Sequence, residues 1–212
     1  MAAAPDHIRN PQEIYRQSFA IIRREADLSR FSKPLDDVAV RLIHACGMID
    51  LIDDLVMSEN AVEAGRAALR NCRPIVCDVD MVRQGIMRRL LPDELPILCR
   101  VADPEAMTMA EELATTRSAA AFDLLAGSMD GAIVAVGNAP TALFRLLEMV
   151  EAGTARPALV VGMPVGFVGA AESKEALIAS SIGVPFIAVR GRRGGSAMAA
   201  AAVNAVAGGL SA

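Results

Sequence analysis

Short apolar runs alternate with amphipathic stretches from about residue 72 to the end of the chain. The apolar runs are continuous, which is typical of strands that are buried on both faces of a sheet. Stretches with the helical spacing of apolar residues separate them. This alternation predicts an α/β fold: a doubly wound, mostly parallel five-stranded sheet of the flavodoxin-like, three-layer α/β/α type, preceded by N-terminal helices. The predicted strands are residues 75–78, 97–101, 132–137, 158–163 and 186–190.

The first N-terminal helix is predicted to begin at Asn10, a suitable N-cap, with Pro11 at the first helical position. Its apolar face is expected at Ile14, Ile21 and Ile22. Ser18 falls on that same face. A serine in such a place either bonds back to its own helix or contacts a ligand, and the pattern alone favours the first interpretation.

A second helix is predicted to begin at residues 32–34 and to end near Gly47. Its buried stripe is expected at Leu35, Val38, Leu42 and Ala45. Asp37, Arg41 and His44 share another side of this helix, at spacings of four and three residues.

His44 is the most informative single residue of the chain. The chain has 2 histidines, and the other, His7, lies close to the N-terminus. A histidine inside an apolar helix, three residues after Arg41, is a candidate proton-transfer group. Cys46 follows two residues later, but side chains at that spacing point about 200° apart on a helix, which disfavours a Cys–His nucleophile.

Two later helices have clear predicted ends. Asn138 is expected to cap one of them, with Pro140 just inside it and Gly153 at its end. The last helix is expected to follow residues 194–196 and to continue, rich in alanine, to Ala207.

Length and composition favour one domain over residues 1–212, with a core of aliphatic side chains. Hydrophobic residues make up 53% of the chain and aromatic residues 3%, with no tryptophan, which disfavours stacking platforms for single-stranded nucleic acid. Lys and Arg total 21 against 25 Asp and Glu, a net charge of −4, so nucleic acid is not an expected partner.

Arginines occur in small scattered clusters that suit the recognition of individual anionic groups. Examples are residues 23–24, 88–89 and 190–193, although each cluster alone is also explained by a solvated surface. Arg117 lies in a predicted helix among small residues, which leaves its guanidinium room to meet a carboxylate. An exposed surface arginine is the alternative there.

The cysteines lack a CxxC pair, so neither a zinc site nor a disulfide framework is expected. We expect them to be small buried residues in a reducing cytoplasm. No stretch has the apolar core of a signal peptide or the length of a membrane span, so no membrane partner is expected. The four cysteines are Cys46, Cys72, Cys77 and Cys99.

Three glycine- or proline-rich loops follow predicted strands and lead into helices, at 137–142, 162–174 and 190–197. Glycine amides and helix N-termini suit anionic ligands, although a tight turn explains any one loop equally well. The nucleotide motifs GxxxxGK[ST] and GxGxxG are absent from the positions where they would be informative. Three such loops at one sheet edge favour an anionic or carboxylate-bearing ligand. The candidate binding residues are Gly137, Asn138, Gly166, Lys174, Gly194, Gly195 and Ser196.

Long, specific motifs occur at residues 14–31, 39–47, 116–121, 137–149, 162–177 and 183–205. Together these segments resemble the precorrin-8X methylmutase family of cobalamin biosynthesis. The resemblance implies an isomerase that moves a methyl group from C11 to C12 of the corrinoid macrocycle, converting precorrin-8X to hydrogenobyrinate with no organic cofactor and no metal. The family's catalytic histidine matches His44, and its substrate-contacting serine and arginine match Ser18 and Arg41. Residues 48–71 carry no function transferred from the family.

This chemistry agrees with the pattern of the residues. The substrate carries many acetate and propionate groups, which the loops and scattered arginines, Arg117 included, are suited to bind. A sigmatropic methyl shift needs a polarised, well-held macrocycle, and a protonated His44 supplies a proton for that purpose. Asp37 or a backbone carbonyl is a candidate to set the protonation of His44. Because a macrocycle is too large for a cleft between two short loops, we expect a homodimer in which each subunit completes the other's pocket.

Three other functions remain open on the sequence alone. A corrinoid carrier would keep the loops without needing His44. A cobalt-precorrin-8 methylmutase would act on the cobalt complex, although the segments look closer to the metal-free type. A phosphate-ester or nucleotide enzyme on the same fold would need a metal-binding carboxylate cluster, for which Asp78 and Asp80 are the close pair at a predicted strand end.

Overall fold

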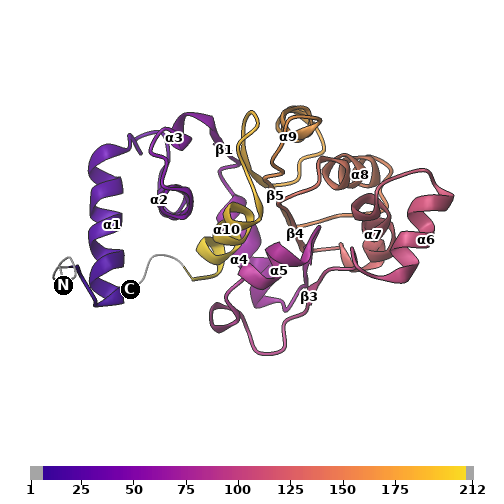
Figure 1. Ribbon diagram of the computed structural model, residues 1–212, viewed down its shortest axis with the longest axis horizontal. Coiled ribbons are helices and arrows are strands. Elements are labelled where there is room, and N and C mark those ends of the chain that lie inside the picture. Colours follow the sequence, from indigo (N-terminus) through magenta and orange to yellow (C-terminus); the bar gives the residue numbers. More distant parts are fainter. Residues whose placement is uncertain (1–6, 209–212) are drawn as a thin grey trace, which may run out of the picture.

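A six-stranded sheet in the order β1-β6-β5-β4-β2-β3 runs through the middle of the protein (Figure 1). The computed structural model describes residues 7–208, and all statements about the structure concern this range. Strands β2 to β6 are parallel and lie in the order β3-β2-β4-β5-β6, which is the flavodoxin-like order. The predicted fold class is therefore confirmed. The strands are β1 (Leu55–Met57), β2 (Ile75–Cys77), β3 (Ile97–Leu98), β4 (Ile133–Val136), β5 (Leu159–Gly162) and β6 (Phe186–Val189).

The prediction of five strands was wrong by one, because β1 was not expected. This strand pairs antiparallel with β6 at the edge of the sheet, with Leu55 opposite Val189. Only three residues long and directly preceded by a helical turn, it leaves no period-2 pattern in the sequence. The 97–101 strand is also shorter than predicted, since β3 ends at Leu98.

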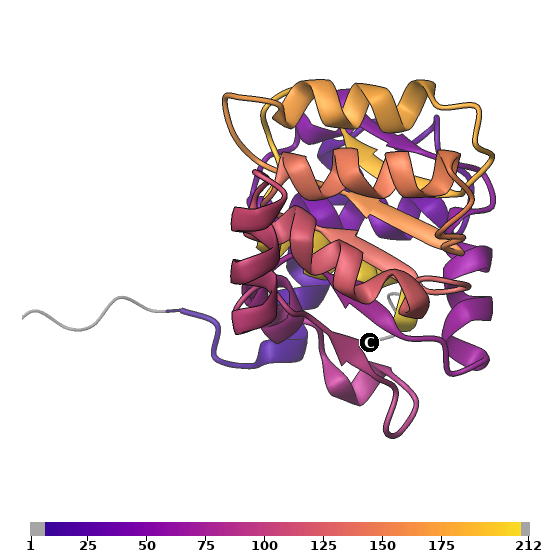
Figure 2. The ribbon, with the colours of Figure 1, turned by 90° about the vertical axis from the view of Figure 1, so that its right-hand side faces the viewer.

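Helices cover both faces of the sheet (Figures 1 and 2). Helices α4, α5 and α10 pack on one face, with α2 and then α1 outside α10, whereas α6 to α9 form the other layer. The helices are α1 (Pro11–Glu25), α2 (Leu35–Cys46), α3 (Leu51–Asp54), α4 (Ala61–Arg70), α5 (Asp80–Gly85), α6 (Pro104–Glu112), α7 (Arg117–Leu125), α8 (Pro140–Glu151), α9 (Ala170–Ala179) and α10 (Ser196–Gly208), with 3-10 turns η1 (Arg88–Leu90) and η2 (Ala126–Ser128).

The central strands are buried on both faces, which explains their continuous apolar runs. Ile75, Ile133 and Leu159 belong to the hydrophobic cluster beneath α2, α4 and α10. Their neighbours Val134 and Val160 belong to the cluster beneath α7 and α8. In the range 7–208, no helix is long and apolar enough to cross a membrane.

The two N-terminal helices begin close to the predicted residues, but their buried faces differ from the prediction. Asn10 caps α1 by accepting the N–H groups of residues 12 and 13. Ile22 is buried, whereas Ile14 and Ile21 are 45% and 42% exposed. In α2 the predicted stripe is buried except for Ala45, which is exposed. Packing on both α1 and α10 shifts the buried arc of α2 toward other positions.

Two further predictions need correction. Asn138 does not cap α8, because the cap residue is Ala139 and no side chain caps this helix. Gly153 follows its end with φ of 72°, as expected for a glycine that stops a helix. Cys72 is exposed rather than buried, since it lies in the turn after α4, whereas Cys77 is buried in β2. Residues 1–6, part of the segment expected not to be a signal peptide, lie outside the described range.

Candidate active site

Ser18 and His44 form a hydrogen bond between the two N-terminal helices. Ser18 Oγ in α1 lies 2.8 Å from Nδ1 of His44 in α2. Ser18 therefore bonds to another helix, not to its own as its pattern suggested. The bond fixes the orientation of the imidazole ring and leaves Nε2 as the nitrogen that Ser18 does not engage.

Two aromatic rings from α1 surround the imidazole. The ring centroids of Tyr15 and Phe19 lie 5.2 Å and 5.3 Å from that of His44, with Phe19 in an edge-to-face arrangement. The sequence-based predictions did not include these two residues, although their spacing of four places them together on the side of α1 that carries Ser18. Together the rings define an apolar setting for the histidine.

Burial lowers the pKa of His44 below its ordinary value of 6.5, and the nearby Arg41 cation lowers the pKa further. Both effects favour the neutral imidazole in the ligand-free protein. Asp37 does not set this protonation, since its carboxylate pairs with Arg23 at 2.5 Å. The partner of Nδ1 is Ser18.

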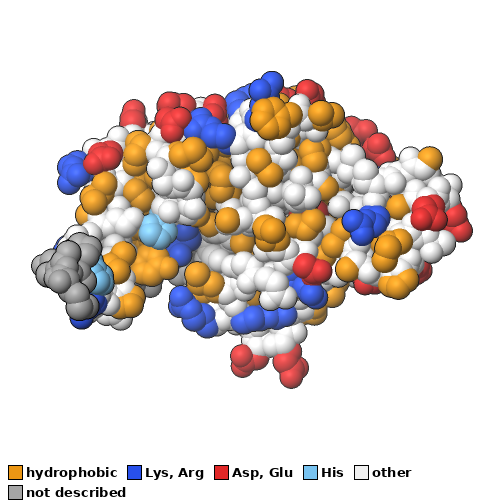
Figure 3. Space-filling view, in the orientation of Figure 1, with side chains coloured by type: hydrophobic (Ala, Val, Ile, Leu, Met, Phe, Trp, Pro, Cys, Tyr) orange, Lys and Arg blue, Asp and Glu red, His pale blue; other side chains and the backbone are white. Residues whose placement is uncertain are grey.

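Arg41 lies on the same helix as His44, one turn earlier. Its guanidinium carbon is 5.7 Å from the centroid of the Phe19 ring, a cation–π contact. Burial lowers the pKa of Arg41, and the cation of Arg89 in η1 contributes to this shift. Figure 3 shows histidine, basic and hydrophobic side chains together on this part of the surface. The Arg41 cation near His44, with the Arg89 cation near Arg41, suits an anionic ligand group.

A cavity of about 430 Å³ contains the Ser18–His44 pair. Helix α1 supplies much of its apolar wall, including the two partly exposed isoleucines Ile14 and Ile21, which explains why they are not packed in the core. Gln17 and Glu25 add polar groups. The wall of this cavity is therefore apolar with a few polar groups, as is usual for a site that binds a large organic ligand.

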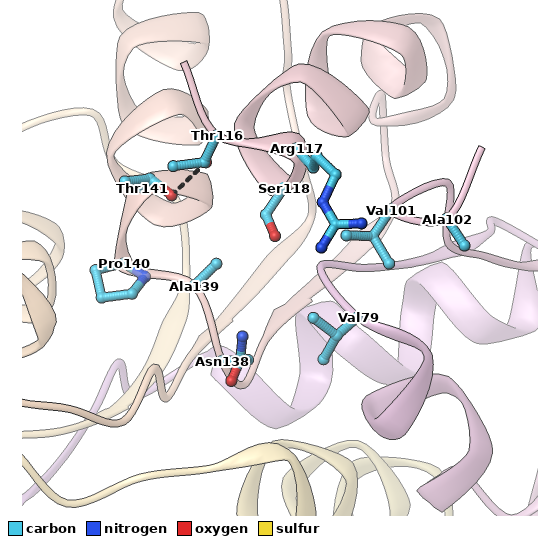
Figure 4. A pocket seen from close by; sticks show the side chains of 10 residues that line it. All are labelled: Val79, Val101, Ala102, Thr116, Arg117, Ser118, Asn138, Ala139, Pro140 and Thr141. Atoms are coloured by element: carbon cyan, nitrogen blue, oxygen red, sulfur yellow. Dashed lines mark hydrogen bonds between the residues drawn. The ribbon is translucent and has the colours of Figure 1, made fainter. Parts of the chain in front are cut away.

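A second cavity, of about 590 Å³, contains Arg117 and Asn138. It lies beyond the carboxyl ends of β2 and β4, where the strand order reverses and where ligands bind in this class of fold. Figure 4 shows Arg117 and Ser118 entering it from α7 and Asn138 facing them from the loop after β4. Thr116 and Thr141 hydrogen-bond at 2.7 Å at its border.

The loop after β4 does not offer its backbone amides to a ligand. Asp78, at the end of β2, accepts hydrogen bonds from the N–H groups of Gly137, Asn138 and Ala139. Burial raises the pKa of Asp78, and these three N–H groups oppose the rise. Any contact between this loop and a ligand therefore uses side chains, of which Asn138 is exposed.

The loops after β5 and β6 are tied to each other. The buried Lys174 donates its Nζ to the carbonyl of Arg193 at 2.6 Å, and burial lowers the pKa of Lys174 to about 8. The N–H of Gly195 donates to the carbonyl of Met163 at 2.8 Å. At Gly194 a Cβ would lie 2.4 Å from that same carbonyl, so the close approach of the loops requires glycine.

Of the residues predicted to bind substrate, the structure thus groups Ser18 with His44 and Arg117 with Asn138. Gly137 directly precedes Asn138 but lines neither of the two cavities. In residues 7–208 the others line neither cavity, and they are Arg41, Gly166, Lys174, Gly194, Gly195 and Ser196. The two cavities share no lining residue in this range.

A metal site is not formed by the carboxylates that the sequence singled out. Both oxygens of Asp78 accept backbone N–H groups, and Asp80 pairs with Arg83 at 2.6 Å. Among residues 7–208, no group of three or more His, Cys, Asp or Glu side chains is placed to hold a metal ion.

The structure thus combines a doubly wound α/β fold with a half-buried histidine at one cavity and an arginine at another. Comparison with known proteins gives the family. The model of the precorrin-8X methylmutase family matches residues 13–208, and the chain belongs to this family. Its members are isomerases of cobalamin biosynthesis that convert precorrin-8X to hydrogenobyrinate by an intramolecular methyl transfer from C11 to C12.

Individual relatives support this assignment. The chain is 55% identical over 202 residues to a precorrin-8X methylmutase of Pseudomonas aeruginosa, covering 95% of this chain and 97% of that one. It is 42% identical over 209 residues to a cobalt-precorrin-8 methylmutase of Salmonella typhimurium, covering 94% and 96%. A solved precorrin-8X methylmutase from Thermus thermophilus superposes with a TM-score of 0.82 at 41% identity, covering 92% and 94%.

Proposed function

We propose that this chain converts metal-free precorrin-8X to hydrogenobyrinate, with His44 as the group that gives and takes the proton. The observation that carries the proposal is the 2.8 Å hydrogen bond from Ser18 to His44 at the wall of an apolar cavity. With Nδ1–H donating to Ser18 Oγ, Nε2 is the nitrogen that gains and loses the proton while the ring stays in place.

Substrate binding itself supplies the conditions for this proton transfer. In the free enzyme, burial and Arg41 hold the pKa of His44 below 6.5. A substrate carboxylate beside Arg41 offsets the field of that cation, which raises the pKa of His44 and favours the protonated form. The protonated ring then polarises the conjugated macrocycle for the methyl shift, without an organic cofactor or a metal.

The remaining predicted contacts hold the rim of the macrocycle. Arg41 and Arg117 are suited to acetate and propionate groups, and Asn138 adds an amide beside Arg117. Gly166, Lys174 and the 194–196 segment shape the neighbouring loops. The proposed role of these residues is to line the site when the macrocycle is bound. Gly137 is proposed to allow close packing of the chain beneath the site.

A homodimer with shared sites is part of this proposal. His44 and Arg117 line separate cavities on one chain, and α1 and α7 lie toward opposite ends of the molecule (Figure 1). A second subunit can bring a surface with Arg117 to the surface with His44, and symmetric dimers are the commonest oligomers. We also propose that residues 1–212 act as one domain, and that the enzyme works in the cytoplasm.

The decisive experiment is to incubate the purified protein with metal-free precorrin-8X in the presence of EDTA. Formation of hydrogenobyrinate, followed by its absorption spectrum and its mass, is the expected result. A shift of absorption bands with unchanged substrate on re-extraction would show a carrier, and turnover of the cobalt complex alone would show the other pathway type. The higher identity to the metal-free relative than to the cobalt relative supports the metal-free substrate.

A further inference from the structure

The Asp78 carboxylate is buried at the switch point of the sheet and has no part in the proposed proton transfer. The residue directly follows β2 and is 0% exposed. Its Oδ1 accepts the N–H of Gly137 at 2.9 Å, and its Oδ2 accepts the N–H groups of Asn138 and Ala139 at 2.8 Å and 2.7 Å. One carboxylate thus links the carboxyl ends of the neighbouring strands β2 and β4.

Three successive N–H groups ahead of a helix form a site suited to an anion. The helix here is α8, which begins at Pro140. In this protein the anion is internal, because Asp78 occupies all three groups. Hydrogen bonds to an ionised acceptor are roughly twice as strong as those between neutral groups, so the carboxylate holds the loop firmly.

The loop is also confined from the opposite side. A Cβ on Gly137 would lie 2.7 Å from the side chain of Val82 and 2.8 Å from the Cα of Ser196, so the chain has no room to move in that direction. Held by Asp78 and by this packing, the backbone presents Asn138 to the cavity opposite Arg117 (Figure 4).

We infer that Asp78 is a positioning residue of the substrate site, which holds the 137–139 backbone so that Asn138 and Arg117 contact the same carboxylate-bearing edge of the macrocycle. This inference rests on the proposed roles of Arg117 and Asn138 in binding. Asp78 itself touches no substrate and acts through the loop.

The test compares Asp78→Asn with Asp130→Asn. In Asp78→Asn an amide NH₂ faces backbone donors, so the 137–139 segment loses part of its support. Asp130 accepts the N–H of Arg156 at 3.0 Å before the amino end of β4, so Asp130→Asn makes the same substitution away from the 137–139 segment and keeps one oxygen that can accept this N–H. Both variants are assayed well below the lower melting temperature, with precorrin-8X turnover, hydrogenobyrinate binding and amide hydrogen exchange as readouts.

We expect Asp78→Asn to raise KM and the dissociation constant of the product by about tenfold while kcat changes by less than about threefold. Exchange at residues 137–139 is expected to become faster. Asp130→Asn is expected to leave KM unchanged whatever its melting temperature. An unchanged KM in Asp78→Asn with faster exchange at 137–139, or an equal rise of KM in Asp130→Asn, would overturn the inference.

Arg117→Ala separates this inference from the proposed function. If Arg117→Ala raises KM and Asp78→Asn does not, the positioning role alone fails. If Arg117→Ala leaves KM unchanged, the proposed contact fails, and the role of Asp78 fails with it. If Asp78→Asn does not fold, Asp78→Ser, which keeps one hydrogen-bond acceptor, takes its place. In addition, the amides of residues 137–139 must exchange slowly in the ligand-free wild type for the inference to stand.

Discussion

Ser18 and His44 are 26 positions apart in the chain, and their side chains meet at 2.8 Å because α1 packs against α2. A serine hydroxyl donates as well as accepts, so the contact serves both the neutral and the protonated imidazole. The histidine can therefore change its protonation without losing its orientation. The first predictions concern this pair.

His44→Ala should lose turnover by about 10²- to 10⁴-fold, because a general acid or base contributes on that order. Binding of hydrogenobyrinate should change little, since the arginines and the loops remain. Single-turnover kinetics and spectral titration measure the two effects. The variant of the other histidine, His7→Ala, is the control and should keep normal turnover. Near-normal turnover in His44→Ala would remove the residue from the mechanism.

Ser18→Ala should lower kcat by about three- to tenfold, a factor that corresponds to the free energy of one net hydrogen bond. The melting temperature should change little. Ser18→Thr keeps the hydroxyl and should retain most of the activity. The ¹⁵N chemical shifts of the His44 ring report directly whether the tautomer has changed. Equal activities for the alanine and threonine variants would show that the hydroxyl does not act on His44.

The pKa of His44 in the ligand-free protein should lie below 6.5 and should rise in Arg41→Gln, because that variant removes a nearby positive charge. NMR titration of the imidazole gives both values, with His7→Gln used to assign the signals. In a pH profile of kcat/KM, the limb that reports loss of the His44 proton should move to higher pH in the same variant. A midpoint that stays in place in Arg41→Gln would show that burial alone sets the shift.

Lys174 should make stability depend on pH on the alkaline side. Its pKa is lowered from 10.5 to about 8 in the folded protein, so between these values the unfolded chain holds a proton that the folded protein has released. The free energy of unfolding should therefore rise as pH increases from about 8 to 10.5. Its slope against pH should correspond to at most one proton. Urea unfolding of Lys174→Met should lack this contribution. Lys33→Met, at an exposed lysine, is the matched control and should keep it.

Mixing His44→Ala with Arg117→Ala, at a substrate concentration low enough that the raised KM leaves Arg117→Ala almost without turnover, tests the proposed shared site. When His44→Ala and Arg117→Ala subunits are allowed to exchange, a mixed dimer has one site with both native residues and one with neither. Random pairing should then restore about a quarter of the wild-type activity. Light scattering should show a dimer throughout. No recovery after proven exchange would place both residues of each site on one chain, and an active monomer would exclude the dimer.

The sequence by itself determined the parallel sheet and the candidate histidine. Continuous apolar runs such as 132–137 and 158–163 arise because strands covered on both faces leave no polar positions, so the pattern is local and readable. Asn10 and Pro11 likewise act within one turn of their helix. The composition of the loops after β4, β5 and β6 predicts ligand contacts there, and among those candidates the structure places Asn138 at a cavity.

Only the tertiary structure decided which groups meet. Nothing in the spacing of residues 15–19 and 44 shows that Ser18, Tyr15 and Phe19 surround His44, because that depends on how α1 packs against α2. Nor does the sequence show that Asp78 takes up the amides of the 137–139 loop, since this contact spans 59 to 61 positions between neighbouring strands. Contacts of that kind follow from sheet order and helix packing, which arise from many weak long-range interactions and leave no local pattern.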